Sequence, residues 1–518
     1  MSDIPFLARE LVRLGTKCVF GIPGEGPSLL LLDELEKCGC AFHLVSHEAA
    51  GALAAAGFGR IAGGPGVSLS IKGPGFSNML SGIASNWLDR NPVLSLSESY
   101  GPGSSLHGQH KRLDHATMAG PVVKAYGDNV SPELLPRLWD LCLTEEPGPV
   151  HLDISHSMQR TFAEGADKKV QTCRYFMSPA VARRIDKAQR PVVIAGGLAT
   201  RRPWFRHLAT LRIPVFTTFA GKGAYDETLP YSAGVFTNSG GPVSPEREIL
   251  PKSDLILGLG LRTTEILEVR PLPAPLIALD EFAGTSKGLE PVVEEVGGTE
   301  DFLQGIERLG DKQWGESDLY RAKEALAGKL NVRSWLPAGV FRTAQQALPD
   351  STVFVLDTGS FCTIGEHTLK ARRPLQVIGS ALARSMGVAI PMAVGAGLAA
   401  RGAPVVVITG DGGMRMYAET ISIAVREKLP MLVLLMADGF LSSVRRSAFK
   451  GGLSERYLRV DSSPWGATVQ AWGCPAERIE SLADFDSALT HWKYSPGPLL
   501  MELPFDADEY MLMTDGIR

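Results

Sequence analysis

Residues Val405–Ser443, VVVITGDGGMRMYAETISIAVREKLPMLVLLMADGFLSS, decide how the rest of the chain is interpreted. An apolar run at 405–408 leads into Gly410-Asp411-Gly412-Gly413. After a helix-like segment, a second apolar run at 431–436 is followed by Asp438. This alternation predicts a strand–helix–strand unit with a carboxylate at the carboxyl end of each strand. Because open α/β sheets bind ligands at those ends, we expect a binding site there.

The residue types at these strand ends favour a site for a metal ion and a diphosphate. Gly410, Gly412 and Gly413 let backbone amides approach a phosphate closely, at the start of a helix whose dipole favours anions. Asp411 and Asp438 supply oxygen ligands for a hard divalent cation, which in turn can bridge a diphosphate. The simpler alternative is that Gly-Asp-Gly forms only a turn.

Length and composition indicate a globular protein of several domains. The chain has 518 residues, too many for one hydrophobic core, so we expect three domains. A formal net charge of −4 gives no basic surplus that would indicate nucleic acid or an anionic membrane as a partner. We see no apolar run of membrane-spanning length and no signal-peptide layout, and the 7 cysteines are widely spread. We therefore expect a cytoplasmic protein with reduced thiols.

Short apolar runs alternate with helix-like segments along the chain and predict an α/β fold of three doubly wound parallel-sheet domains. We place an N-terminal domain at 1–165, a central domain at 175–325 and a C-terminal domain at 335–518. Polar or charged segments at 160–173 and 283–334 are predicted linkers. The first and third domains could be distant structural relatives, since both patterns are doubly wound.

Five further motifs accompany the 405–443 stretch. They are Phe20-Gly-Ile-Pro-Gly24, His47-Glu48, Lys72-Gly-Pro-Gly-Phe-Ser-Asn-Met79, Asp89-Arg-Asn-Pro-Val93 and Ala220-Gly-Lys-Gly223. In order and spacing, the set resembles the thiamine-diphosphate-dependent enzymes, in their acetolactate synthase-like, benzaldehyde lyase-like and 2-keto acid decarboxylase branch. The resemblance implies a pyrimidine-binding, a central and a diphosphate-binding domain.

The resemblance also implies thiamine diphosphate (ThDP) and Mg2+ as cofactors. Asp411, Asp438 and the backbone carbonyl of Phe440 would be the protein ligands of Mg2+, and the glycines of 410–413 would lie against the diphosphate. One departure is that the family usually has Asn where this chain has Asp438. A second carboxylate is a stronger oxygen ligand, but it also adds negative charge beside the diphosphate.

Glu48 would act on the other end of the cofactor. By resemblance it hydrogen-bonds N1′ of the aminopyrimidine ring and shuttles a proton, while Gly24 and Gly75 belong to the loops that bind the same half of the cofactor. This shuttle would allow the cofactor's own nitrogen to deprotonate the thiazolium carbon. Taken alone, a Glu at the start of a helix is more often a charge that complements the helix dipole.

The bent cofactor of this family requires an apolar wedge. Met386, within Gly379–Gly387, falls at the wedge position, although a core methionine would give the same pattern. Two residues earlier the family usually has Gly, whose carbonyl receives the 4′-amino group, and this chain has Arg384. The carbonyl of Arg384 can still make that contact. Its guanidinium could bind a substrate carboxylate or point to solvent.

Glu25 is a predicted catalytic residue on the substrate side. It follows Pro23-Gly24, where decarboxylases of the family carry an acidic residue facing the reacting carbon. Arg445-Arg446, a short distance after Asp438, could bind a second substrate or a carboxylate, or could lie on a solvated helix face.

His110 is the other predicted catalytic residue. It lies in the segment His107–His115, where relatives place a Gln or His that points at the reacting carbon of the cofactor. A shift of one residue would select Gln109 or Lys111 instead, and a histidine-rich surface loop is the alternative.

The resemblance implies an enzyme that makes or breaks a C–C bond beside a carbonyl. We expect an acetolactate synthase-like decarboxylating carboligase that acts on a small 2-keto acid or an aldehyde. Simple 2-keto acid decarboxylation and acyloin cleavage are alternatives, and a catalytically silent cofactor-binding homologue is a further one. FAD is possible but not favoured, because the central domain lacks a complete G-x-G-x-x-G fingerprint. We expect a homodimer or homotetramer with shared active sites, and no nucleic acid or membrane partner.

Overall fold

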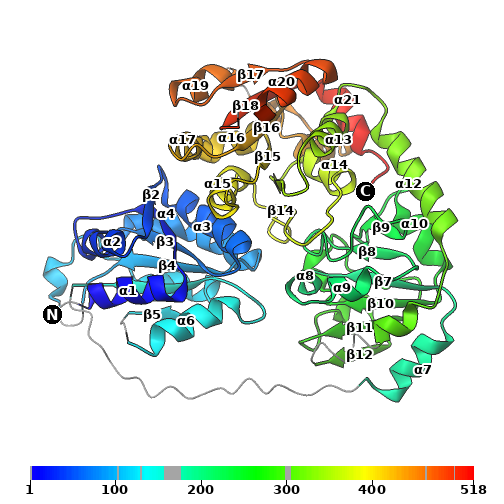
Figure 1. Cartoon of the computed structure of the whole chain (residues 1–518), viewed down its shortest axis with the longest axis horizontal. Helices are drawn as coiled ribbons and strands as arrows, with labels where there is room; N and C mark the ends of the chain where they lie inside the picture. The colour runs from blue at the N-terminus through cyan, green and yellow to red at the C-terminus, as the bar shows by residue number, and fades with distance from the viewer. Residues whose placement is uncertain are drawn as a thin grey trace.

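Three all-parallel sheets of six strands each form the protein, which confirms the predicted α/β class with three doubly wound domains (Figure 1). The computed structural model describes residues 3–101, 104–128, 131–156, 177–297, 305–460, 464–494 and 496–518. The predicted linker at 160–173 lies outside the described residues. Within them, no helix combines the length and the apolar character needed to cross a membrane.

The N-terminal sheet has the strand order β2-β1-β3-β4-β6-β5. Its strands are β1 (Cys18–Ile22), β2 (Ala41–Leu44), β3 (Gly66–Ser70), β4 (Val93–Glu98), β5 (Tyr126–Gly127) and β6 (Val150–Ile154). Its helices are α1 (Ile4–Leu14), α2 (Pro27–Lys37), α3 (Glu48–Ala62), α4 (Pro74–Leu88), α5 (His115–Ala119) and α6 (Leu134–Leu143). β3, β4 and β6 are buried along their whole length, because helices cover both faces of a parallel sheet.

The central sheet has the order β12-β11-β10-β7-β8-β9. Its strands are β7 (Pro191–Ala195), β8 (Val215–Thr217), β9 (Ser232–Val235), β10 (Leu255–Leu259), β11 (Leu276–Asp280) and β12 (Val293–Val296). Its helices include α7 (Pro179–Lys187), α8 (Leu198–Arg201), α9 (Phe205–Leu208) and α10 (Pro245–Ile249).

The linker predicted at 283–334 is wrong in part, because it contains the edge strand β12 and the helix α12 (Glu316–Leu330). β12 reads Val-Glu-Glu-Val and is only half-buried, so its charged residues conceal the strand pattern. α12 contributes Leu319 to the central core and Leu326 and Leu330 to the C-terminal core, which joins these two domains.

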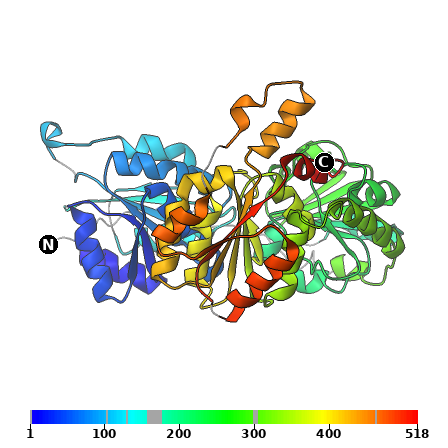
Figure 2. The same cartoon turned by 90° about the horizontal axis from the view of Figure 1, so that it is seen from above.

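The C-terminal sheet has the order β14-β13-β15-β16-β18-β17. Its strands are β13 (Val353–Leu356), β14 (Val377–Gly379), β15 (Val405–Gly410), β16 (Met431–Ala437), β17 (Ala476–Arg478) and β18 (Leu499–Pro504). Its helices are α13 (Pro337–Ala347), α14 (Ser360–Thr368), α15 (Ala389–Ala399), α16 (Asp411–Tyr417), α17 (Ile421–Arg426), α18 (Ser442–Lys450), α19 (Trp465–Ala471), α20 (Leu482–Tyr494) and α21 (Ala507–Thr514). Seen from above, this domain lies between the other two (Figure 2).

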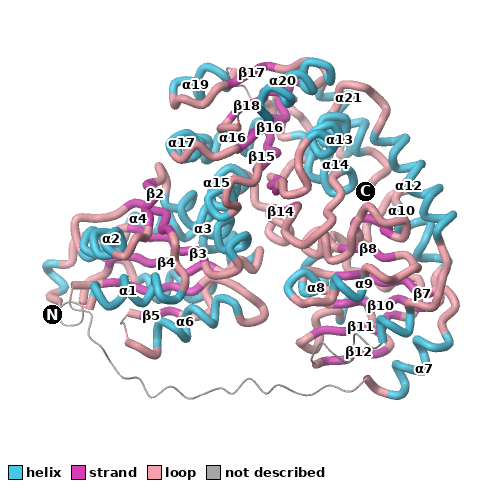
Figure 3. Tube along the Cα trace, viewed as in Figure 1, coloured by secondary structure: helices cyan, strands magenta, loops and turns pink. Residues whose placement is uncertain are grey.

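The first and third sheets share one topology. Numbered from its own first strand, each has the order 2-1-3-4-6-5, whereas the central sheet has the order 3-2-1-4-5-6 when counted the same way. The three groups of strands stand apart in the trace (Figure 3). The direction of the connections reverses between strands 1 and 3 in the outer domains and between strands 1 and 4 in the central domain. Ligands of doubly wound sheets bind at such switch points.

Two equivalent helices join the N-terminal and C-terminal domains. α3 and α15 each connect the second and third strands of their domain, and their small residues pack against each other. A Cβ atom on Gly57 would lie 1.9 Å from the carbonyl oxygen of Met392, and one on Gly395 would lie 1.8 Å from that of Ala54. Only glycine allows backbones this close, so the contact fixes how the two domains meet.

We predict that Gly395→Ala destabilises the protein by about 1–3 kcal/mol, because the added methyl group overlaps the Ala54 carbonyl. The measurement is the shift of the urea unfolding midpoint followed by tryptophan fluorescence. Gly328→Ala is the matched control, since its Cβ meets nothing within 4 Å and alanine favours the helix by about 1 kcal/mol. An equal or higher midpoint for Gly395→Ala would contradict the close contact.

Candidate active site

Asp411 and Asp438 lie at the carboxyl ends of adjacent parallel strands. β15 pairs with β16 up to Gly410 opposite Met436, so the residues that follow each strand emerge side by side. Asp411 is 3% exposed, and its Oδ2 accepts the N–H of Gly439 at 2.8 Å. Asp438 is half-buried and accepts the hydroxyl of Ser442. The structure thus brings together the two predicted metal ligands.

The electrostatics of this pair fit a divalent cation. Burial raises the pKa of Asp411 to about 6, and the charge of Asp438 adds to the shift. Burial also raises the pKa of Asp438. A cation between the two carboxylates would offset both the desolvation and the repulsion, and oxygen ligands suit Mg2+. Phe440, the third predicted ligand, lies two residues beyond Asp438, with the guanidinium of Arg445 4.3 Å from its ring centre.

The glycines of segment 410–413 have no room for a side chain. A Cβ on Gly413 would lie 2.2 Å from Oδ2 of Asp357, and one on Gly412 would lie 2.7 Å from Leu441 and 2.9 Å from the sulfur of Met386. The packing of the protein therefore requires glycine at both positions, and the contact of their amides with a diphosphate stays a prediction.

Asp357 is a site residue that the sequence analysis missed. It follows β13, is 1% exposed and accepts hydrogen bonds from the Thr409 hydroxyl and the Gly387 N–H, each at 2.8 Å. Burial raises the pKa of Asp357 to about 6. It ties together the switch-point strands and the loop that carries Met386. The available signal was its place directly after the apolar run 353–356, by the same rule that selected Asp411.

The proposed wedge segment lies beside the glycine loop. Met386 is 38% exposed, with its sulfur against Gly412. Arg384 has φ 51°, the left-handed conformation that glycine adopts without strain. Its guanidinium donates to Glu366 at 2.5 Å and lies 5.6 Å from the ring centre of Phe219. In this chain the guanidinium of Arg384 is therefore engaged by a buried carboxylate and does not extend freely into solvent.

Glu48 begins α3 in the N-terminal domain and is 6% exposed. The Asn78 amide donates to its Oε2 at 3.0 Å. A Cβ on Gly75 would lie 3.1 Å from its Oε1, so glycine keeps α4 close to the carboxylate. Glu48, Gly75 and Asn78 thus form one cluster at the carboxyl edge of the sheet.

Within one chain, the start of α3 meets the far end of the helix that follows the metal pair. The ring of His47 lies 5.6 Å from that of Tyr417, the last residue of α16, whereas Asp411 is its first. Because α16 has 7 residues, Asp411 at its start and Tyr417 at its end lie about 9 Å apart along the helix axis.

Glu98 is a second residue that the sequence analysis missed. It ends β4 with no exposed surface and accepts the Ser28 hydroxyl at 2.5 Å, the Gly26 N–H at 3.1 Å and the Lys72 ammonium at 3.1 Å. The Gly24 N–H donates to the Ser28 hydroxyl at 2.8 Å. This carboxylate therefore fixes the loop on which Gly24 and Glu25 lie. The available signal was its place at the end of a strand, whereas its partners come from α2 and from the loops after β1 and β3.

Glu25 and His110 are both exposed. His110 contributes its backbone carbonyl, which accepts the Tyr100 hydroxyl at 2.6 Å. The neighbouring residues Gln109 and Lys111 line a cavity of about 440 Å3 at the carboxyl ends of β3, β4 and β6, together with Lys72 and Tyr100. The two alternatives to His110 therefore face this cavity.

Beneath the cavity lies a buried network of His115, His151, Asp153 and Tyr126. Asp153 accepts from His115 at 2.8 Å, His151 at 3.1 Å and the Tyr126 hydroxyl at 2.7 Å. His115 also accepts the N–H of Gly73 at 3.1 Å. These bonds occupy the carboxylate, so the network serves to hold the loop that leads to Gly75.

Arg445 and Arg446 are engaged within the C-terminal domain. Arg445 donates to Glu455 at 2.8 Å and Asp508 at 2.7 Å, and Arg446 donates to the backbone carbonyl of Arg518 at 3.1 Å. The charge of Arg445 nevertheless acts on the Asp411–Asp438 pair: burial raises the pKa of Asp438, and Arg445 opposes that rise.

Comparison with known proteins agrees with this geometry. Residues 5–118 match the thiamine pyrophosphate enzyme N-terminal TPP binding domain, 179–287 match the central domain, and 357–503 match the C-terminal TPP binding domain. Thiamine pyrophosphate is another name for ThDP. The chain belongs to the thiamine pyrophosphate enzyme family, and its relatives place it in the acetolactate synthase-like branch.

Three relatives are each about one-quarter identical to this chain over almost its whole length. A probable acetolactate synthase large subunit of Methanocaldococcus jannaschii is 24% identical, covering 99% of this chain and 93% of that protein. A probable 2-ketoarginine decarboxylase of Pseudomonas aeruginosa is 26% identical, covering 96% and 93%. The acetolactate synthase of Bacillus subtilis is 25% identical, covering 98% and 94%.

We predict that Glu98→Gln destabilises the protein by about 1–3 kcal/mol, because the buried amide loses the charge-assisted hydrogen bonds from Ser28 and Lys72. The measurement is the free energy of unfolding in urea. Glu25→Gln, an exposed change on the loop that Glu98 holds, should stay within about 0.5 kcal/mol of the parent protein. Equal effects of the two substitutions would show that Glu98 does not organise the loop.

Proposed function

We propose that the protein is a ThDP- and Mg2+-dependent enzyme that makes or breaks a C–C bond beside a carbonyl, most specifically a decarboxylating carboligase acting on a 2-keto acid. The observation that carries this proposal is the pair of carboxylates on adjacent strand ends, buried Asp411 and half-buried Asp438, beside the glycines of 410–413. The acetolactate synthases among the relatives support the carboligase assignment.

Each residue of the site has a role in this proposal. ThDP, when bound, supplies a carbon nucleophile and an electron sink for cleavage of the bond next to the carbonyl. Asp411, Asp438 and the Phe440 carbonyl would hold Mg2+, and 410–413 would receive the diphosphate. Met386 would support the bent cofactor, and the Arg384 carbonyl would accept its amino group.

Glu48 holds and moves the proton at N1′ of the pyrimidine ring. Its carboxylate is kept in place by Asn78 and is enclosed by α4, which shields the proton transfer from water. Glu25, and Gln109 or Lys111 in place of His110, would face the substrate. A cytoplasmic location goes with this proposal, since the cysteines among the described residues are free thiols.

Simple decarboxylation is the second candidate, favoured by the acidic Glu25 and by the 2-ketoarginine decarboxylase among the relatives. Assays of CO2 release from a panel of 2-keto acids, with and without an acceptor aldehyde or keto acid, separate the two. Product formation that requires the acceptor supports the carboligase. A silent homologue is not favoured, because Glu48 is retained with its Asn78 support.

We predict that Glu48→Gln lowers turnover by at least about a hundredfold, because the amide cannot relay the proton. ThDP binding should remain measurable by calorimetry, since the diphosphate half of the site is unchanged. Turnover equal to that of the parent protein would remove Glu48 from the mechanism.

We predict that Asp411→Asn raises the Mg2+ concentration needed for ThDP binding by at least about tenfold, because a buried charged ligand is lost. Asp438→Asn is the matched comparison and should change it less, since Asn is the family's usual ligand there. The measurement is a Mg2+ titration in the presence of ThDP. A larger effect of Asp438→Asn than of Asp411→Asn would contradict these ligand roles.

We propose a homodimer or a tetramer of dimers, in which Glu48 of one chain faces Asp411 of another. When Glu48→Gln and Asp411→Asn chains are mixed, the mixed dimer then contains one site with both parent residues. Random pairing should restore about a quarter of the parent activity. Activity no higher than that of the separate variants would place both residues in one chain's site.

A further inference from the structure

The carboxyl edge of the central sheet is the place where its fold would bind a ligand. Strands β7 and β10 are neighbours there, and the connections that follow them leave in opposite directions. In dinucleotide-binding domains with this strand order, the diphosphate lies at this point, on the backbone amides of the turn after the first strand.

In this chain the carboxylate of Glu265 already accepts a backbone hydrogen bond from that turn. Gly197 follows β7, and its N–H donates to Oε2 of Glu265 at 2.7 Å. The Thr218 hydroxyl donates to the same oxygen at 2.8 Å. Glu265 is buried, and a Cβ on Gly196 would lie 2.9 Å from its carboxylate. The anion that the turn can bind is therefore a residue of the central domain itself.

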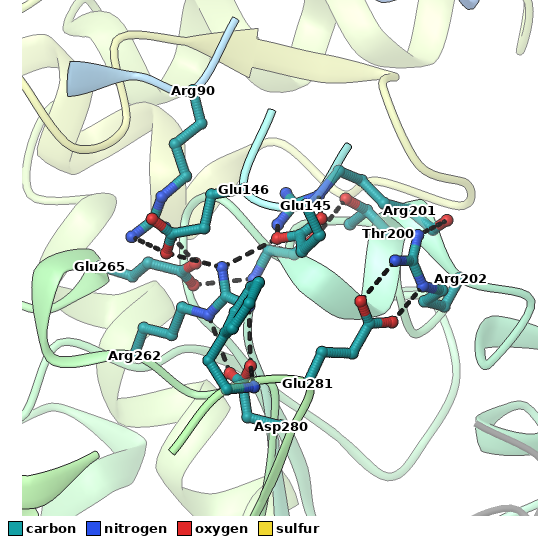
Figure 4. A network of polar contacts seen from close by, with 12 residues as sticks. Arg90, Glu145, Glu146, Thr200, Arg201, Arg202, Arg262, Glu265, Asp280 and Glu281 are labelled. Carbon is teal, nitrogen blue, oxygen red and sulfur yellow. Dashed lines mark hydrogen bonds and ion pairs between the residues drawn. The ribbon is translucent and has the colours of Figure 1, made fainter. Parts of the chain in front are cut away.

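Arg262, a buried cation of the same cluster, is also fully engaged (Figure 4). Its Nε and Nη2 donate to the two oxygens of Asp280, each at 2.8 Å. Its Nη1 donates to Glu145 and to Glu146, again at 2.8 Å each, and both glutamates come from the N-terminal domain. The guanidinium is 1% exposed, so no other anion can reach it without displacing one of these carboxylates.

Two more arginines complete the contact between the domains. Arg201 of α8 donates to both oxygens of Glu145, at 2.9 and 2.6 Å. The guanidinium of Arg90 lies 2.7 Å from Glu146 of the N-terminal domain and 3.2 Å from Glu265 of the central domain, so it links carboxylates of both domains. Burial alone would raise the pKa of Glu145, but Arg201 and Arg262 lower it to about 2.

The carboxylates of the cluster already pair with its guanidinium groups: Arg90, Arg201 and Arg262 face Glu145, Glu146, Glu265 and Asp280. A diphosphate would therefore have to displace one of these carboxylates from an arginine, which is unfavourable because it leaves that carboxylate without its partner. The cavity of about 350 Å3 beside the cluster is lined by Arg60, Arg90, Arg201 and Arg202 and by Asp89, Glu145 and Glu265.

We propose that Glu145, Glu146 and Glu265 take the place of a nucleotide's diphosphate in the central crevice. The chain then binds no adenine nucleotide there, neither ADP nor FAD, and uses its own carboxylates to hold the N-terminal domain against the central domain. This inference is independent of the reaction catalysed at the ThDP site.

The test uses the full chain and the variant E145Q/E146Q, which keeps the side-chain size and removes both charges. Calorimetric titration of the parent protein with ADP and with FAD should give no saturable binding. In the variant, hydrogen–deuterium exchange of the amides of residues 197–202 should be at least about tenfold faster, because the contact across the domains is lost.

E281Q is the matched control. It removes the Arg202–Glu281 pair, which lies within the central domain beside the cluster, and it should leave exchange at 197–202 within about twofold of the parent protein. If the double variant does not fold, E146Q alone removes the bonds to Arg90 and Arg262 and is compared in the same way. Saturable binding of ADP or FAD by the parent protein overturns the proposal. So does exchange in the folded variant that is no faster than in E281Q.

Discussion

The contact between α3 and α15 determines how the rest of the structure is arranged. Two glycines bring the helices so close that a carbonyl oxygen of each occupies the space of a side chain missing from the other. α3 begins with Glu48, and α15 follows the loop that carries Met386. A single close packing interaction therefore sets how these two domains meet within one chain. In the proposed dimer, where Glu48 of one chain faces Asp411 of another, this contact fixes the two surfaces that each chain brings to the shared sites.

Much of the fold was predictable because all three sheets are parallel and covered on both faces. Such strands read as continuous apolar runs, and the residues that follow them lie at the ligand-binding edge. This rule places Asp411, Asp438 and Glu48 correctly at strand ends, and the same rule would have selected Asp357 and Glu98. The edge strand β12 escaped prediction because its two glutamates interrupt the apolar pattern.

The remaining features depend on contacts between distant segments, which no local pattern records. Arg384 is unusual at its position, but only the folded chain shows that Glu366 engages it. The cluster around Arg262 draws glutamates from the N-terminal domain and an arginine from α8, and none of these stretches resembles a motif. Gln109, His110 and Lys111 are consecutive in the sequence, and only the conformation of their loop decides which of them borders the cavity. Sequence identifies strand ends well and long-range partners poorly.

The packing of α3 also bears on how the chain reaches its native state during synthesis. The residues of α3 from 49 to 59 are buried, in part against α15, which the ribosome makes only after the whole central domain. A nascent N-terminal domain therefore carries an uncovered apolar helix face for most of translation. Exposed surface of this kind is where chains associate wrongly or where chaperones bind, and it is hidden only when the last domain docks.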